Sequence, residues 1–312
     1  MEDTDGGKTT HEEVDDTGTD GESFFLPLHS AFALSVFCEA AYAHDSAADI
    51  THSIEQQLAM QSDPICSEVS DMTKINHEHN HAIYFICALS DRDMGWSDDE
   101  TKRDTVVVAF RGSSNTTEFL EDARSLRCAE FKSSSGDHLA WAGNGFIAAY
   151  QNLRNVGLLD KVITLSASCD HRLVITGHSL GGAIATLMTL ELYKTILNES
   201  NKGYKLALVT YGCPRTLRES SAKEMCRFRG VVFGRFVNYG DLIPTVPDEA
   251  YMHCCYPYVY GYSHTHMNEW TLVHDRDYGG KNMMHESYMH AVDCHSVTIA
   301  SSRGYGKHLI NL

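Results

Sequence analysis

Basic side chains, proline and paired cysteines are all scarce in this sequence. Its 312 residues carry 25 lysines and arginines against 42 aspartates and glutamates, a formal net charge of −17. A surface of that charge repels polyanions, so we expect no nucleic acid partner. The ten cysteines include no CxxC pair and are too sparse for a disulfide scaffold. A reducing compartment follows from this usage, and we expect a cytoplasmic protein.

Long apolar runs are absent as well. The longest uncharged stretch, Phe24 to Cys38, is shorter than the about 20 residues that a membrane span needs. We therefore predict no transmembrane segment. Acidic residues precede this stretch, which argues against a signal peptide. Residues 1–22 hold nine acidic side chains and one lysine, so we expect a disordered acidic tail there. Residues 23–312 contain no repeat or linker and are predicted to form a single domain.

The remainder alternates between strand-like and helix-like segments. Apolar side chains from Leu34 to Tyr42 recur at helical spacing, whereas residues 61–81 are polar and suggest a loop. A strand is predicted at 82–89. Short apolar runs, typical of buried parallel strands, occupy 105–110, 172–176, 205–211 and 235–239. Helical stretches fall at 145–155, 181–197 and 217–227. This order predicts an α/β fold, a mostly parallel central sheet with helices on both faces.

One motif, Gly177-His178-Ser179-Leu180-Gly181, carries the clearest chemistry. It follows a predicted strand and begins a predicted helix, which is the context of a serine nucleophile on a sharp turn. Side chains two residues from the serine would crowd such a turn, which explains Gly177 and Gly181. The alternative is a glycine-rich turn with an idle serine.

A serine nucleophile needs a histidine base and an acid that orients it. Asp241 follows the strand at 235–239 and is the best acid, although a plain turn aspartate would have the same sequence context. Downstream of Ser179 the base candidates are numerous: His253, His264, His266, His274, His285, His290 and His295.

From about residue 31 the chain resembles the fungal-type class 3 lipases, which have the α/β-hydrolase fold. The resemblance rests on five segments in that family's order: 107–114, 145–150, 176–183, 211–215 and 235–244. It implies that Asp241, 62 residues after Ser179, is the catalytic acid, and that His285 of the H-x-x-Y segment is the base, with His290 and then His295 as alternatives. It also implies hydrolysis of a lipid or other ester, possible contact with a lipid–water interface, and no cofactor or metal.

The same resemblance assigns the oxyanion donors and a lid. The backbone N–H groups of Ser113 and Leu180 would stabilise the oxyanion, although Ser113 also fits an ordinary strand-end turn. Residues 115–127 form the lid segment, with Phe119, Leu120 and Ala123 on its apolar face, and a fixed surface helix is the alternative. Two positions depart from the family pattern, Gly143 in place of a frequent histidine and Phe119 in place of a frequent lid tryptophan.

Other features left several functions open. A metal site at His77, His79 and His81 lacks a second ligand pair, and alternating tyrosines at 256–262 fit either an acyl groove or cross-strand packing. Within the enzyme class, the substrate alternatives to acylglycerols are phospholipid acyl chains and feruloyl-type aryl esters. A different class, a catalytically silent interaction module, is disfavoured because no member of the triad is missing.

Overall fold

The core of the fold is a mixed eight-stranded sheet with the strand order β1-β2-β3-β6-β7-β9-β11-β12. The computed structural model describes residues 26, 28–42, 47–59, 66–78, 80–113, 121–123, 126–197, 204–238, 240–247, 250–260 and 270–272. The strands of this sheet are β1 (Cys66–His77), β2 (Asn80–Ser90), β3 (Lys102–Phe110), β6 (Arg172–His178), β7 (Lys205–Tyr211), β9 (Val231–Asn238), β11 (Tyr258–Tyr260) and β12 (Trp270–Leu272). Strands β3, β6, β7, β9 and β11 are parallel neighbours, and β1, β2 and β12 join antiparallel at the two ends.

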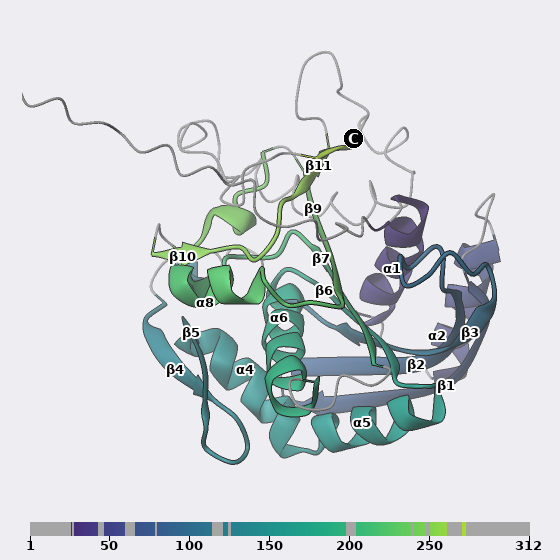
Figure 1. Cartoon of the computed structure of the whole chain (residues 1–312), viewed down its shortest axis with the longest axis horizontal. Helices are drawn as coiled ribbons and strands as arrows, with labels where there is room; N and C mark the ends of the chain where they lie inside the picture. Colours follow the sequence, from purple (N-terminus) through teal and green to yellow (C-terminus); the bar gives the residue numbers. More distant parts are fainter. Residues whose placement is uncertain are drawn as a thin grey trace, which may run out of the picture.

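Helices cover both faces of the sheet, as the sequence predicted (Figure 1). One face packs against α1 (Leu28–Ala40) and α2 (Ala47–Ala59), and the other against α4 (Asn144–Asn155), α5 (Leu158–Ser168) and α6 (Leu180–Leu192). A π-helical turn, η1 (Tyr193–Leu197), extends α6. Each face therefore has its own apolar core.

The central strands are apolar on both sides because both cores need their side chains. Val106 and Val108 of β3 point into the core beneath α4, α5 and α6, while Val107 and Ala109 point into the core beneath α1 and α2. All four are fully buried. The continuous apolar run at 105–110 is thus explained by two-sided burial.

A second, smaller sheet lies beside the helices of the α6 face. Its order is β10-β8-β5-β4, formed by β10 (Tyr251–Met252), β8 (Leu217–Arg218), β5 (His138–Gly143) and β4 (Cys128–Lys132). Helix α8 (Glu219–Met225) follows β8, and the 3-10 turn η2 (Ile243–Thr245) precedes β10.

Four segments differ from the sequence prediction. Residues 61–81 were predicted to be a loop, yet β1 occupies most of this range and pairs with β2. Strand β1 is at the sheet edge, so few of its side chains are buried, and two register shifts interrupt its alternation. The predicted helix at 217–227 begins as strand β8, and helices α2 and α5 were not predicted at all.

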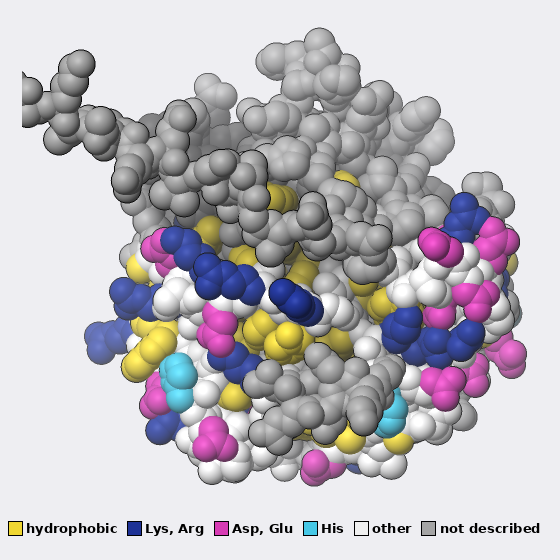
Figure 2. All heavy atoms as spheres, viewed as in Figure 1, with side chains coloured by type: hydrophobic (Ala, Val, Ile, Leu, Met, Phe, Trp, Pro, Cys, Tyr) yellow, Lys and Arg dark blue, Asp and Glu magenta, His cyan; other side chains and the backbone are white. Residues whose placement is uncertain are grey.

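The face shown in Figure 2 carries acidic and basic side chains intermixed, with apolar side chains gathered near its middle. Among the residues that the structure describes, no helix is long and apolar enough to span a bilayer.

Candidate active site

Ser179 occupies the turn between strand β6 and helix α6. Its backbone has φ 56° and ψ −127°, and it is the N-cap of the helix. A positive φ in a residue other than glycine costs on the order of 1–3 kcal/mol and persists only where the surroundings enforce it. One interaction that holds this backbone conformation is the hydrogen bond from the Ser179 N–H to the carbonyl oxygen of Tyr211 at the end of β7 (3.0 Å). The serine that the motif singled out is therefore held in a strained, fixed conformation.

The two motif glycines are required by close backbone contacts. A Cβ atom on Gly177 would lie 2.3 Å from the carbonyl carbon and oxygen of Gly181. A Cβ atom on Gly181 would lie 2.1 Å from the carbonyl oxygen of Phe110 at the end of β3. The turn is thus packed against itself and against the neighbouring strand, which is the crowding expected from the sequence.

The loop after β3, Arg111–Ser113, lies directly against this turn. A Cβ atom on Gly112 would be 3.0 Å from the Ser179 Cβ and 2.6 Å from the carbonyl oxygen of His178. Ser113, the predicted first oxyanion donor, is the next residue and is half-buried. The second predicted donor, Leu180, is the first residue of α6, where backbone amides have no partner within the helix. Both predicted donors are therefore in segments that adjoin Ser179.

Asp241 lies in the turn that follows β9 and is 4% exposed. Its Oδ1 accepts the N–H of Ile243 at 2.9 Å, and its own N–H donates to the carbonyl of Asn238 at 3.1 Å. Strands β6 and β9 are parallel, with β7 between them, so Ser179 and Asp241 follow strand ends at the same sheet edge. Two strand steps correspond to about 10 Å, enough to leave room for an imidazole between the two side chains.

The predicted base His285 and its alternatives His290 and His295 lie outside the described residues. Of the histidine candidates downstream of Ser179, the structure describes His253, which is 5% exposed and in hydrogen-bond contact with the Pro244 carbonyl through Nε2 (2.8 Å). Burial, with repulsion from Arg235 and Arg215, lowers the pKa of His253 well below its usual value. A base that must become positively charged is disfavoured in such surroundings.

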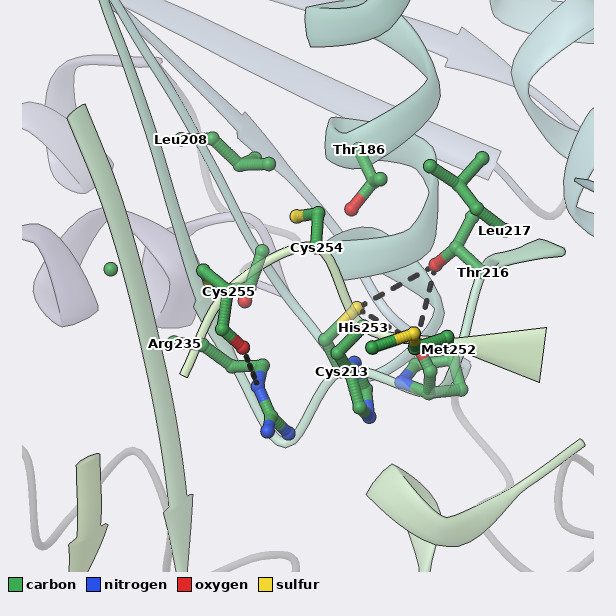
Figure 3. Close-up of a pocket in the computed structure, with 13 residues that line it drawn as sticks. Thr186, Leu208, Cys213, Thr216, Leu217, Arg235, Met252, His253, Cys254 and Cys255 are labelled. Atoms are coloured by element: carbon green, nitrogen blue, oxygen red, sulfur yellow. Dashed lines mark hydrogen bonds between the residues drawn. The ribbon is translucent and has the colours of Figure 1, made fainter. Parts of the chain in front are cut away.

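His253 lines a pocket that is separate from the serine turn (Figure 3). Cys213 and Arg235 lie on the same pocket wall, and the Arg235 Nε donates to the Cys255 carbonyl at 3.3 Å. Cys213 contacts Pro214 and Thr216 through its thiol, and burial raises its pKa to about 12. Ser179 is not among the lining residues. A protonated thiol beside a backbone carbonyl is a packing group, so Cys213 is not a nucleophile.

Part of the predicted lid segment can be located. Phe119 and Leu120 lie outside the described residues, while residues 121–123 are helical. Ala123 is buried in the core on the α6 side of the sheet, and Leu126 packs against the same core. The end of the segment is therefore anchored, next to Gly143 and Gly145 at the start of α4.

The remaining sequence candidates have structural partners. His81 contacts Arg111 (Nδ1 to Nη1, 3.2 Å), and His79 lies outside the described residues. Within the described part of the chain, no group of three histidine, cysteine or acidic side chains is arranged to hold a metal ion. Tyr258 stacks on Phe236 with ring centroids 5.1 Å apart, as cross-strand packing predicts.

The sequence analysis missed Tyr42 as a contact of the serine turn. It follows α1, and its apolar spacing with Leu34 suggested only a core position. The phenol nevertheless contacts His178, the residue before Ser179 (Oη to Nδ1, 2.8 Å). No local pattern indicates this, because 136 residues separate the two partners.

Comparison with known proteins agrees with this geometry. Residues 107–251 match the family model described as lipase (class 3). A lipase from Rhizopus niveus is 29% identical over 167 residues, which cover 54% of this chain and 41% of that lipase. A chloroplastic phospholipase A1 from Arabidopsis thaliana, phospholipase A1-Igamma2, is also 29% identical, over 48% of this chain and 33% of that protein. The chain thus spans less than half the length of these curated relatives.

The solved structure of a fungal lipase–inhibitor complex, described as a model for interfacial activation, superposes with a TM-score of 0.61 at 17% identity. The match covers 87% of this chain and 95% of that one. This likeness confirms the predicted α/β-hydrolase fold.

Proposed function

Through residues 107–251 this chain belongs to the class 3 lipases, and from that premise we propose that it is a serine carboxylester hydrolase acting on acylglycerols. The observation that carries the proposal is the strained Ser179, held at φ 56° between the end of β6 and the first amide of α6. Ser179 is buried, and a turn of this kind places its hydroxyl where a helix N-terminus favours negative charge. Nothing in ordinary packing requires a serine in so unfavourable a conformation.

The reaction begins when the Ser179 Oγ attacks the ester carbonyl carbon while His285 accepts the hydroxyl proton. The carbonyl oxygen becomes an oxyanion, which accepts hydrogen bonds from the N–H groups of Ser113 and Leu180. The tetrahedral intermediate collapses as the protonated His285 gives its proton to the departing alcohol oxygen. Water then attacks the acyl-enzyme by the same steps and releases the fatty acid.

Asp241 holds the imidazole of His285 in the tautomer that can accept the serine proton. Its buried carboxylate is fixed by the Ile243 N–H, so its orientation does not depend on the histidine. An acid that is oriented in advance stabilises the imidazolium without reorganisation during the reaction. The turn after β9 thus supplies the acid, Asp241, and the C-terminal segment supplies the base, His285.

Phospholipid acyl chains are the second candidate substrate. The match to phospholipase A1-Igamma2 has the same identity as the match to the Rhizopus lipase, so sequence similarity does not separate the two. The segment 115–127 would act as a lid that uncovers the acyl site at a lipid–water interface. Its acidic residues Glu121 and Asp122 are exposed, which disfavours anionic phospholipids relative to uncharged acylglycerols and zwitterionic phospholipids.

Substrate profiling tests the proposal. The purified chain is assayed on p-nitrophenyl esters of several chain lengths, emulsified triacylglycerol, phosphatidylcholine vesicles and methyl ferulate, with Ser179→Ala as the blank. We expect turnover of the nitrophenyl esters and a higher rate on triacylglycerol than on phosphatidylcholine. A faster rate on phosphatidylcholine would identify the chain as a phospholipase, and a preference for methyl ferulate would identify it as an aryl esterase. No turnover on any ester would support a catalytically silent interaction module.

A further inference from the structure

The Tyr42 hydroxyl lies between the two chain segments that supply the oxyanion donors. On one side it contacts the imidazole of His178 (Oη to Nδ1, 2.8 Å), the residue before Ser179. The two rings are 5.9 Å apart between centroids. His178 ends strand β6, so this contact ties Tyr42 to the serine turn.

On the other side the same oxygen contacts the loop after β3. The backbone of Gly112 lies directly against the Tyr42 oxygen. A Cβ atom on Gly112 would lie 2.2 Å from that oxygen, a distance that no side chain tolerates. The Arg111 guanidinium also lies 5.8 Å from the centre of the Tyr42 ring, within range of a cation–π contact.

The phenol keeps its proton in this position. Burial is the largest influence on the pKa of Tyr42 and raises it well above its usual value, while Gly112 and Arg111 oppose that shift. A protonated hydroxyl can donate to the His178 Nδ1 while it packs against the Gly112 backbone. One oxygen atom thereby bridges the loop and the turn.

Helix α1 supplies a rigid support for Tyr42. The Cys38 thiol contacts the Thr176 hydroxyl of β6 at 3.1 Å, and the Tyr211 hydroxyl of β7 donates to the Ala31 carbonyl. Phe37 packs edge-to-face on Phe85 of β2, with centroids 5.2 Å apart. Residues before Tyr42 are therefore fixed to three strands of the sheet.

We propose that Tyr42 is a positioning residue that sets the distance between the two oxyanion donors, the backbone amides of Ser113 and Leu180. One donor follows Gly112 directly, and the other lies two residues beyond His178. The two segments are paired as far as Phe110 and Gly177, where the β3–β6 ladder ends. Beyond that point the Tyr42 hydroxyl is a side-chain contact that touches both the loop and the turn. This inference rests on the proposed function, because it assumes that both amides act on an ester oxyanion.

The test is the isosteric substitution Tyr42→Phe, which removes the bridging oxygen alone. Loss of one complete oxyanion donor costs on the order of 10² to 10³ in rate, so a displaced donor should cost about 10- to 100-fold in kcat. We expect KM for a soluble nitrophenyl ester to stay within about threefold. The affinity of a trifluoromethyl ketone, which forms a tetrahedral adduct, should fall by the same factor as kcat. Rates are normalised to the sites titrated with a fluorophosphonate.

Tyr193→Phe is the matched control. Its hydroxyl accepts the N–H of Arg229 (3.1 Å) and its ring stacks on Phe228, away from the serine turn. This variant should lose a similar amount of stability yet keep kcat and ketone affinity.

A second variant, His178→Leu, removes the other partner of the bridge and must reproduce the loss of kcat, which decides the question if Tyr42→Phe does not fold. Wild-type kcat per titrated site in either folded variant would overturn the inference, as would a loss confined to KM or to the titratable fraction. A wild-type chain that neither turns over an ester nor reacts with a fluorophosphonate would overturn the proposed function instead.

Discussion

Individual residues differ in how far the sequence could predict them. Ser179 was identifiable because its glycine neighbours, and the strand and helix around them, are all local in sequence. Asp241 could be predicted from two features alone: it follows a predicted strand, and it comes after the serine in the chain. The contact of Tyr42 with His178 spans 136 residues and depends on how α1 crosses the sheet, so no local pattern could reveal it.

Asp241→Asn tests the acid at the residue scale. The amide oxygen can still accept the Ile243 N–H, which the carboxylate Oδ1 now accepts at 2.9 Å, so we expect the fold to persist. Loss of the charge and of the correct histidine tautomer should reduce kcat by about 10⁴-fold. Asp137→Asn, in the β4–β5 turn, is the control and should leave kcat unchanged. Steady-state kinetics with circular dichroism would check both, and less than a tenfold loss in Asp241→Asn would remove it from the triad.

His285→Ala tests the base. We expect kcat to fall by about 10⁴- to 10⁶-fold, because the serine then has no proton acceptor. His290 lies five positions further on, which would be about 140° away if the segment were helical, so His290→Ala should retain most activity. His295→Ala is expected to behave like His290→Ala. A large loss in either of these two variants, with an active His285→Ala, would reassign the base.

Elements with strong local signals were predicted well. The strands β6 and β7 are apolar on both faces, and α6 follows the serine motif directly. Strand β1 was missed because an edge strand buries little and register shifts disrupt its alternation. Helix α2 was missed although Ile50, Ile54 and Leu58 recur at helical spacing and are buried. They pack toward α1 and β1.

The close approach of α6 to β3 is testable at this scale. In Gly181→Ala the new Cβ would meet the Phe110 carbonyl oxygen at 2.1 Å, a rigid backbone atom. We expect a loss of about 1–3 kcal/mol in the free energy of unfolding, together with loss of activity. Gly145→Ala is the control, since its Cβ meets only the flexible end of Leu126 at 2.7 Å. Urea titrations would measure both variants, and equal stabilities would contradict the packing described here.

At the scale of the whole molecule, the net charge of −17 is distributed unevenly. Residues 1–22 contribute −8 of it, and they were predicted to be a disordered tail beside a single domain formed by residues 23–312. Composition alone supports that prediction, because a segment with so few apolar side chains has nothing to bury. The layered sheet could be predicted from the alternation of strands and helices, whereas the small second sheet joins short segments far apart in sequence.

Deletion of residues 1–22 tests the predicted division of the chain into a disordered tail and a single folded domain. We expect the unfolding free energy to stay within about 0.5 kcal/mol and kcat on a soluble ester to stay within about twofold, because a segment with so few apolar side chains is predicted to add nothing to the core. Thermal unfolding and steady-state kinetics on the full and shortened chains would measure this. A shortened chain that aggregates or loses activity would show that the tail belongs to the folded unit.

The most direct test of the central claim, that Ser179 is the nucleophile of an ester hydrolase, is labelling by a fluorophosphonate followed by peptide mass mapping. The account predicts one adduct per chain, on the peptide that contains Ser179, and its loss in Ser179→Ala together with ester hydrolysis. That variant should unfold at nearly the wild-type temperature. An adduct on a different serine, or persistent hydrolysis in folded Ser179→Ala, would contradict the account.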